Sequence, residues 1–208
     1  KGFLNTLIIV VVAVPCVTAF SLWVSSAIYK MHSIPRSFFR CVFYLPVVTG
    51  SVAITVVWKW ILNPYNGILN QVAGTTGFDW LGTQSTALWF IILILFTTSI
   101  GQPIVLYVAA LGNVDQSLIE AAQVDGATKL QVFWKIKWPQ IMPTTLYVLV
   151  ITTINSFQCF ALIQLLTKGG PLNSTMTIMY QVYDTAYRLN DLGYACAIGV
   201  VLAIIIAI

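Results

Sequence analysis

The chain has 208 residues, of which 59% are hydrophobic and only 8% are charged, and its formal net charge is +4. Charged residues make up roughly a quarter of a soluble domain, so this composition excludes one and indicates an integral membrane protein. The sequence has no Ser/His/Asp set, no phosphate-binding glycine loop and no pair of facing carboxylates, and its four cysteines lack metal-ligand spacing. We therefore expect neither an enzyme nor a metal site.

The apolar residues are gathered in long runs. A helix that crosses about 30 Å of hydrocarbon needs about 20 residues. Four runs are long enough, at residues 3–29, 41–62, 87–111 and 141–166, and a fifth begins near Leu192 and is still apolar at Ile208. Because these runs do not alternate apolar and polar residues as strands do, we expect an all-α, polytopic membrane helix bundle. It would contain about five transmembrane helices in a single domain over residues 1–208.

Two segments are expected to depart from straight helices. Gly101 lies beside Pro103 in the third run, which predicts a kink or a broken helix. Residues 175–188, between the fourth and fifth runs, could lie along the outer membrane interface or prolong the last helix. We favour the interface.

Basic residues indicate how the bundle is oriented. The loops 63–86 and 167–191 hold only Lys168 and Arg188 as basic residues. The first and third loops are richer, with Lys30, Arg36, Arg40, Lys129, Lys135 and Lys137. Lys/Arg-rich loops face the cytoplasm, so the first and third loops are predicted to be cytoplasmic.

The third loop has the pattern of a short helix-turn-helix. Asp115 or Ser117 can cap a first helix, and Ser117-x-x-Glu120 fits a capping box. Gly126 is suited to a left-handed helix stop. Thr128 can then begin a second helix, because Gln131 completes another capping-box pattern, and we expect this helix to end by Pro139.

Polar residues inside the apolar runs form two candidate stripes. In the fourth run the spacing i, i+3, i+4, i+7 predicts one helical face, made of Thr152, Asn155, Ser156 and Cys159. In the third run Thr97, Gly101 and Ile104 share a face. Such faces can line a water-filled path through the membrane, or they can pack helices together. The residues alone leave both open.

The third loop also carries a motif. The motif begins with Glu120-Ala121-Ala122, and after three more residues, the last of which is Asp125, comes Gly126. Nine residues then separate Gly126 from Ile136, and Pro139 follows. This pattern resembles the signature loop of binding-protein-dependent ABC importer permeases. Trp138 stands where that family usually has leucine. The resemblance implies that this loop forms a coupling helix that docks in a cleft of a cytoplasmic ATPase subunit.

A second resemblance concerns the outer loops. The segment from Phe160 to Pro171, followed by Asn173-Ser174-Thr175, is similar to carbohydrate-importing permeases of the maltose and glycerol-phosphate types. The match covers essentially the whole chain but lacks the family's first transmembrane helix and the end of its last. It implies that Gly169, Gly170 and Pro171 face an external solute-binding protein. Both polar stripes coincide with positions that line the sugar site of the maltose permease subunit, with different side chains.

The resemblance implies a sugar importer subunit that works by alternating access in a bacterial or archaeal inner membrane. Its partners would be a second permease subunit, an ATPase dimer that carries ATP and magnesium, and a solute-binding protein. We expect no cofactor in this chain and no nucleic acid partner. A glycerol-phosphate or polyol cargo is an alternative. An ion-coupled carrier or a membrane scaffold is another, although the runs lack the buried acids that such carriers use.

Overall fold

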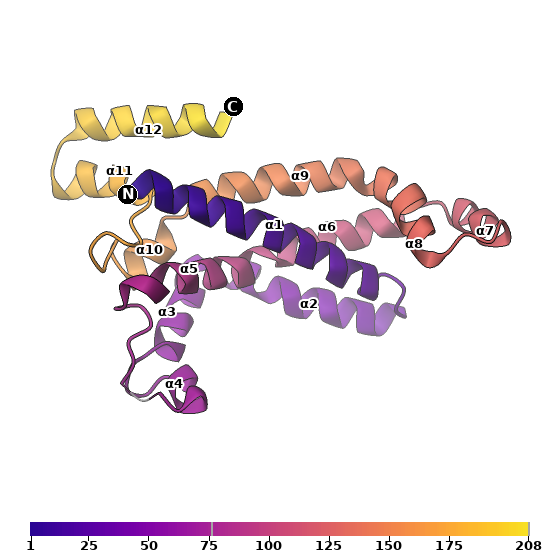
Figure 1. Ribbon diagram of the computed structural model, residues 1–208, viewed down its shortest axis with the longest axis horizontal. Coiled ribbons are helices and arrows are strands. Elements are labelled where there is room, and N and C mark those ends of the chain that lie inside the picture. The colour runs from indigo at the N-terminus through magenta and orange to yellow at the C-terminus, as the bar shows by residue number, and fades with distance from the viewer. Residues whose placement is uncertain (76, 208) are drawn as a thin grey trace.

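The computed structural model describes residues 1–75 and 77–207, and those residues form α-helices and π-helical turns with no β-strand among them. Figure 1 shows long helices lying side by side, with short helices gathered at the two ends of the bundle. The all-α prediction is confirmed.

Helix α1 (Gly2–Ile28) lies in the middle of the bundle and packs on α6, α9 and α5. Ile9 and Val17 are fully buried in its apolar core contacts. Two buried serines of α1 donate hydrogen bonds to backbone carbonyl oxygens of the third span. Ser25 Oγ donates to Ile104 at 3.1 Å, and Ser21 Oγ donates to Ile100 at 3.5 Å. The first predicted span is therefore a helix.

The second predicted span is not one straight helix. Helix α2 (Ser33–Thr49) and α3 (Ser51–Ile61) meet at Gly50 with a bend of 99°. Gly50 has φ 79° and ψ 151°, a conformation essentially restricted to glycine. Helix α2 begins at Ser33, eight residues before Cys41, where the sequence predicted the start of the second span. Beyond α3, the short α4 (Ile68–Ala73) lies away from the long axis of the bundle (Figure 1).

The third span bends where glycine and proline predict it. Helix α5 (Gln84–Ser99) and α6 (Gly101–Gly112) meet at Ile100 with a bend of 41°. Gly101 packs against the backbone of α2 at Phe43 and Tyr44. The predicted break is confirmed, and its glycine permits close contact between α6 and α2.

The third loop and the fourth span form one helical run after the turn at Gly126. Helix α7 (Gln116–Val124) is followed by α8 (Lys129–Val132), the π-helical turn η1 (Phe133–Lys137) and α9 (Trp138–Phe157). The expected end before Pro139 is wrong. Pro139 lies in the first turn of α9, where its missing N–H costs little.

The fourth span is interrupted near its C-terminal end. Helix α9 ends at Phe157, and α10 (Ala161–Leu166) follows a short non-helical stretch. Cys159 lies in that stretch, so the prediction that it shares a helical face with Thr152 is wrong. A regular helical period does not extend past Phe157.

The last segments form a helical hairpin. Helix α11 (Ile178–Tyr183) continues into the π-helical turn η2 (Asp184–Arg188), and both pack against α12 (Leu192–Ala207). The chain reverses at Leu189–Asp191, with Asn190 at φ 57°. Residues 175–188 are therefore not an extension of the last helix, and their place at the membrane interface stays a prediction.

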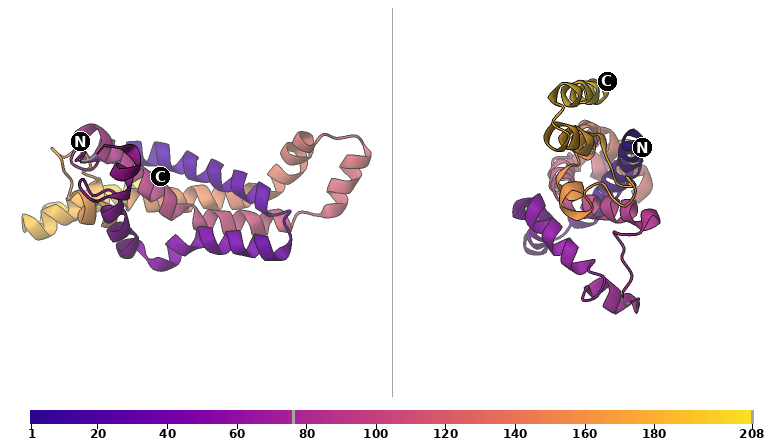
Figure 2. Two further views of the ribbon diagram at one scale, coloured as in Figure 1. Left: turned by 90° about the horizontal axis from the view of Figure 1, so that it is seen from below. Right: turned by 90° about the vertical axis from the view of Figure 1, so that its left-hand side faces the viewer.

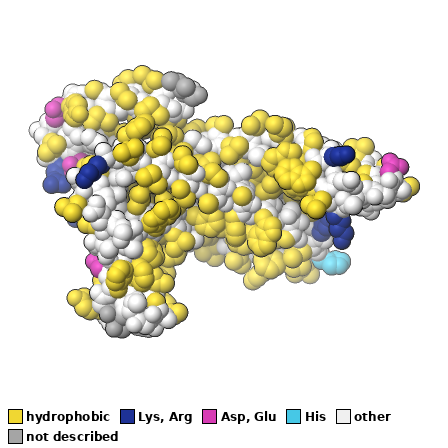
Figure 3. Space-filling model, viewed as in Figure 1, with side chains coloured by type: hydrophobic (Ala, Val, Ile, Leu, Met, Phe, Trp, Pro, Cys, Tyr) yellow, Lys and Arg dark blue, Asp and Glu magenta, His cyan; other side chains and the backbone are white. Residues whose placement is uncertain are grey.

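Length and composition identify the helices that can cross a membrane. Gly2–Ile28 and the run Lys129–Leu166 qualify alone, and the two bent pairs raise the number to four. The fifth predicted span corresponds to α12, which has 16 residues and is shorter than a usual span. Figure 3 shows charged side chains at the two ends of the molecule and apolar side chains along the middle of the visible face.

Candidate functional site

The third loop projects from one end of the bundle (Figure 2, left). The turn between α1 and α2 lies at the same end (Figure 1), so the two basic loops share one side as the charge pattern predicts. The long axis of the bundle separates this end from α3, α4, α10 and α11.

Asp115 is the residue that caps α7. Its Oδ1 accepts a hydrogen bond from the backbone N–H of Ser117 at 2.9 Å. This bond lowers the pKa of the Asp115 carboxyl below its usual value, because it stabilises the charged form. Ser117 lies inside the helix, so of the two predicted caps the aspartate is correct and the capping box of Ser117 with Glu120 is not formed.

The turn between α7 and α8 is built as the sequence predicts. Gly126 has φ 79°, and the N–H of Ala127 donates to the carbonyl oxygen of Ala122 at 2.9 Å, which closes the end of α7. Thr128 and Gln131 form the reciprocal capping box at the start of α8. The loop is therefore a defined helix-turn-helix.

The motif residues divide into an inner and an outer group. Ala122 and Ile136 pack against the buried cluster of Leu111, Val114, Ile119, Val132 and Ile141, which joins the loop to the bundle. Glu120, Ala121, Asp125 and Pro139 are exposed. Ala122 therefore packs within the chain, whereas Glu120, Ala121 and Asp125 are free to contact another molecule.

Large apolar side chains are also exposed on this loop, and the sequence analysis did not single them out. Val124 is 87% exposed, Leu130 is 71% exposed and Leu118 is 48% exposed. Large apolar side chains that are exposed outside the membrane-spanning part can contribute to a protein contact surface. The sequence could have indicated these residues, because leucine and valine stand beside charged residues in a loop outside the apolar runs.

The predicted stripe on α9 is partly buried. Thr152 and Ser156 are buried, whereas Asn155 is exposed. Thr152 and Asn155 line a depression of about 10 Å³ together with Gln102 and Pro103 of α6. This volume holds about one water molecule and not a sugar. Gln102 was missed, although a lone amide in an apolar run is a detectable signal.

The second stripe does not converge on that depression. Thr97 is half-buried and donates to the carbonyl oxygen of Ile94 at 2.8 Å. Gly101 packs on α2 and Ile104 is fully buried beside α1. Cys159 is buried in the core, and its carbonyl oxygen accepts from Thr177 Oγ1 at 3.2 Å. In this conformation these residues make packing contacts, and a role in transport stays a prediction.

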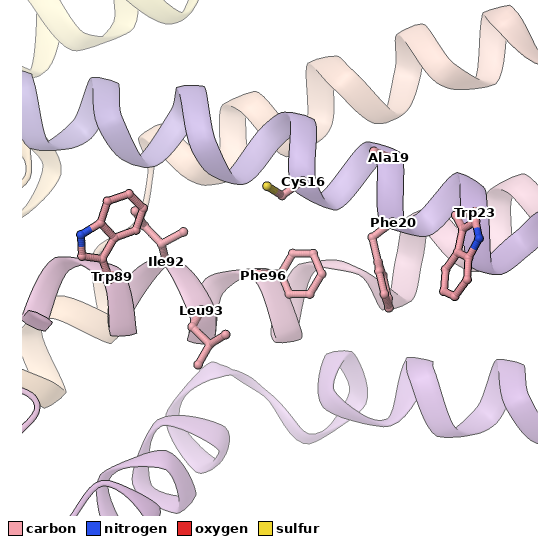
Figure 4. Close-up of a pocket in the computed structure, with 8 residues that line it drawn as sticks. All are labelled: Cys16, Ala19, Phe20, Trp23, Trp89, Ile92, Leu93 and Phe96. Atoms are coloured by element: carbon pink, nitrogen blue, oxygen red, sulfur yellow. The ribbon is translucent and has the colours of Figure 1, made fainter. Parts of the chain in front are cut away.

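An apolar groove lies between α1 and α5 (Figure 4). Its volume is about 560 Å³, and Cys16, Phe20, Trp23, Trp89 and Phe96 are among its lining residues. A sugar needs hydrogen-bonding partners that this lining does not offer. The groove is therefore not a continuation of a sugar path along the two polar stripes, and none of the stripe residues lines it.

The turn predicted to face a binding protein is tightly built. Gly169 has φ 80°, and a β-carbon at this position would lie only 3.0 Å from Tyr180 Cε1. The Gly170–Pro171 peptide bond is cis. Thr175 Oγ1 donates to the carbonyl oxygen of Gly170 at 2.7 Å, and Asn5 Nδ2 of α1 donates to the carbonyl oxygen of Met176 at 2.9 Å. The turn is thus fixed to the end of the bundle where α1 begins.

Together these features define a class of protein: an all-helical membrane bundle that presents a structured helix-turn-helix at the end carrying its basic loops. The chain belongs to the family described as binding-protein-dependent transport system inner membrane component, whose model matches residues 1–208.

Individual relatives agree with this family. The chain is 36% identical over 173 residues to the probable ABC transporter permease protein YurN of Bacillus subtilis, covering 81% of this chain and 59% of that protein. It is 32% identical over 206 residues to YesP, a probable ABC transporter permease of the same organism, covering 96% of this chain and 66% of that protein. The chain thus spans less than two thirds of either relative.

A solved structure shares the fold. A chain from a bacterial alginate ABC transporter, solved in complex with an alginate pentasaccharide-bound periplasmic protein, superposes with a TM-score of 0.84 at 24% identity. The match covers 99% of this chain and 73% of that one. The predicted resemblance to importer permeases is confirmed at the level of family and fold.

Proposed function

We propose that this chain is the transmembrane permease subunit of an ATP-driven sugar importer and forms part of the path that the sugar takes through the membrane. The observation that carries the proposal is the exposed surface of the helix-turn-helix, formed by Glu120, Val124 and Leu130 beside the basic loops. A membrane bundle with such a surface on its cytoplasmic side has a docking place for a soluble partner.

That partner is an ATPase dimer, which holds ATP and magnesium, while this chain holds no cofactor. Ala121 is exposed and small, so a partner surface can approach α7 closely at this point. The Glu120 carboxylate can accept a paired hydrogen bond from an arginine of the partner. Closure of the ATPase dimer moves the loop, and the bundle alternates between inward-facing and outward-facing states.

The cargo in this proposal is a sugar, delivered by an extracytoplasmic solute-binding protein to a pair of permease subunits. Among the relatives, one is named as a multiple sugar-binding transport system permease of Streptococcus mutans, at 31% identity over 175 residues. The residues proposed to line the path are Thr97, Gly101, Ile104, Thr152, Asn155 and Ser156. The residues proposed to contact the binding protein are Gly169, Gly170 and Pro171.

A glycerol-phosphate cargo is the second candidate, because relatives at 29% identity are named as sn-glycerol-3-phosphate permeases. A phosphate path favours a basic side chain at mid-membrane depth. Helices α1, α5, α6, α9 and α12 contain no lysine or arginine within their described bounds. In the second span, Arg36 and Arg40 lie in the first half of α2 and Lys59 near the end of α3, away from the Gly50 bend in its middle. This observation favours a neutral or weakly charged sugar.

The docking surface is tested with the pair Val124→Asp and Val72→Asp. Both valines lie on short helices and are 87% and 82% exposed, but they stand at opposite ends of the bundle. We expect Val124→Asp, and likewise Glu120→Lys, to weaken co-purification of the ATPase subunit about tenfold, the loss of one contact of roughly 1.4 kcal/mol. Val72→Asp should retain the subunit. Equal retention by both valine variants would contradict the proposed docking surface.

A further inference from the structure

A polar cavity lies at the end of the bundle opposite the helix-turn-helix, between α10 and the α11–η2 segment. Its volume is about 410 Å³, within the range of roughly 300–1,000 Å³ that small-molecule sites occupy. The lining residues that matter below are Gln164, Lys168, Tyr183, Asp184, Tyr187 and Arg188. None of them belongs to the two polar stripes or to the Gly169–Pro171 turn.

One wall of the cavity is aromatic. Tyr180, Tyr183 and Tyr187 follow one another at spacings of three and four residues and so share a face of the α11–η2 segment. The ring centroids of Tyr183 and Tyr187 are 5.1 Å apart, and Phe160 lies 4.9 Å from Tyr183 on the other side. Tyr187 is 77% exposed. An aromatic wall of this kind leaves a broad apolar surface with a hydroxyl at its edge.

The opposite wall offers an unused hydrogen-bonding group. The Oε1 atom of Gln164 is buried and has no hydrogen-bond partner among the described residues. A buried acceptor without a partner is unfavourable, because it has lost its hydrogen bonds to water and gained none in return. Gln164 lines the cavity, and rotation of the amide about its terminal bond exchanges its oxygen and nitrogen, so either group can be turned toward a ligand hydroxyl.

The charges around the cavity are only partly paired. Arg188 Nη1 and Asp184 Oδ1 form an ion pair at 3.1 Å, which is the one ion pair found among the described residues. Lys168 is exposed on the α10 side, where it follows the end of α10 at φ 50°. Its ammonium therefore remains available to donate hydrogen bonds into the cavity.

We propose that this cavity is a sugar subsite at the outer mouth of the permease, which holds a pyranose ring of an oligosaccharide. One face of a pyranose ring presents C–H groups, which pack on the exposed ring of Tyr187 and the half-buried ring of Tyr183. Its edge presents hydroxyls, which Gln164 and Lys168 bind. The inference rests on the proposed function, because it names a place where the cargo is held before it enters the bundle.

The test measures sugar binding directly. The assembled full-length complex is placed in nanodiscs without its binding protein, and saturation-transfer NMR is recorded with maltotriose, xylotriose and trigalacturonate. We expect saturation transfer to the ring C–H protons of at least one probe. Tyr187→Ala should raise the apparent Kd of that probe about tenfold, because it removes the exposed stacking surface. Gln164→Leu should weaken binding in the same direction.

The matched control is Tyr194→Ala, which removes a tyrosine that is 57% exposed on α12 and does not line the cavity. It should leave the Kd unchanged. ATP-dependent uptake by the wild-type complex with its binding protein is measured separately. If uptake occurs but none of the probes shows saturation transfer, or if Tyr187→Ala and Tyr194→Ala bind equally, the subsite is wrong. If uptake fails for all three sugars, the proposed cargo is wrong instead.

Discussion

Lys137, the last residue of η1, donates a hydrogen bond to the phenolic oxygen of Tyr29, the residue that directly follows α1. The Lys137 ammonium also lies 4.7 Å from the centroid of the Tyr29 ring. Lys137 is only 7% exposed, so its charge depends on this contact for compensation. The two residues are 108 positions apart, and they join the helix-turn-helix to the inner end of α1.

Tyr29→Phe keeps the ring but removes the oxygen that accepts from Lys137. We expect a loss of about 1–2 kcal/mol in the free energy of unfolding, and a fall of a few degrees in Tm, at about 2–4 °C per kcal/mol for a chain of this size. The measurement is thermal unfolding of the purified protein in detergent. Tyr147→Phe is the control, because Tyr147 is 50% exposed on α9. Equal melting temperatures for the two variants would rule out a stabilising role for the contact.

Gly101 and Gly112 stand at the two ends of α6 and make a matched pair. A β-carbon on Gly101 would overlap the carbonyl oxygen of Phe43 and lie 3.0 Å from Val47 Cγ2, whereas a β-carbon on Gly112 meets nothing within 4 Å. Gly101→Ala should therefore destabilise the protein by about 1–3 kcal/mol. Gly112→Ala should be neutral or slightly stabilising. Comparable unfolding temperatures would show that α6 can move away from α2 without cost.

Gly50 is predicted to be essential for the bend between α2 and α3. Its φ of 79° and ψ of 151° are strained for any residue with a side chain, and Gly50→Ala should cost about 1–3 kcal/mol. Gly199→Ala, in the middle of α12, serves as the control because nothing lies within 4 Å of its β-carbon position. Detergent unfolding curves of both variants provide the measurement. A stable Gly50→Ala protein would mean that the bend tolerates another backbone conformation.

The N-terminal turn of α7 should loosen in acid. The pKa of Asp115 is lowered by the hydrogen bond from Ser117, so the cap is fully present above the ordinary aspartate pKa of about 4 and is lost as the pH falls through the lowered value. Asp115→Asn keeps a capping oxygen and does not titrate. Hydrogen-exchange protection of residues 116–124, corrected for intrinsic rates, should fall in acid for the wild type and remain constant for the variant. Identical profiles would contradict this role of Asp115.

The local features of the helix-turn-helix could be predicted because each depends on a few adjacent residues. Gly126 and the pair Thr128 and Gln131 adopt the predicted stop and capping box. The 99° bend at Gly50 could not be predicted, since one glycine in an apolar run does not reveal whether packing will use its conformational freedom. The prediction that the second loop helix ends by Pro139 was wrong for a similar reason. A proline can either end a helix or occupy its first turn, and the sequence alone does not reveal which backbone conformation precedes it.

The candidate site was harder to predict than the fold. A helical period placed Thr152 and Cys159 on one face, but the helix ends between them at Phe157. The outer cavity brings together Gln164 and Tyr187, which lie 23 positions apart, and no local pattern joins them. The spacing of Tyr180, Tyr183 and Tyr187 across α11 and η2 was visible in the sequence. The wall that faces these tyrosines depends on how α10 and α11 pack.

The run Lys129–Leu166 contains 38 residues and passes from the exposed loop to the outer face with only the η1 turn and a short interruption after Phe157. At 1.5 Å per residue, Leu130 and Thr152 are about 33 Å apart along its axis. A stiff rod of this length cannot tilt at one end and stay still at the other. In the proposed function, a partner that moves Leu130 therefore also moves Thr152, because both residues lie on the helical run before its interruption at Phe157.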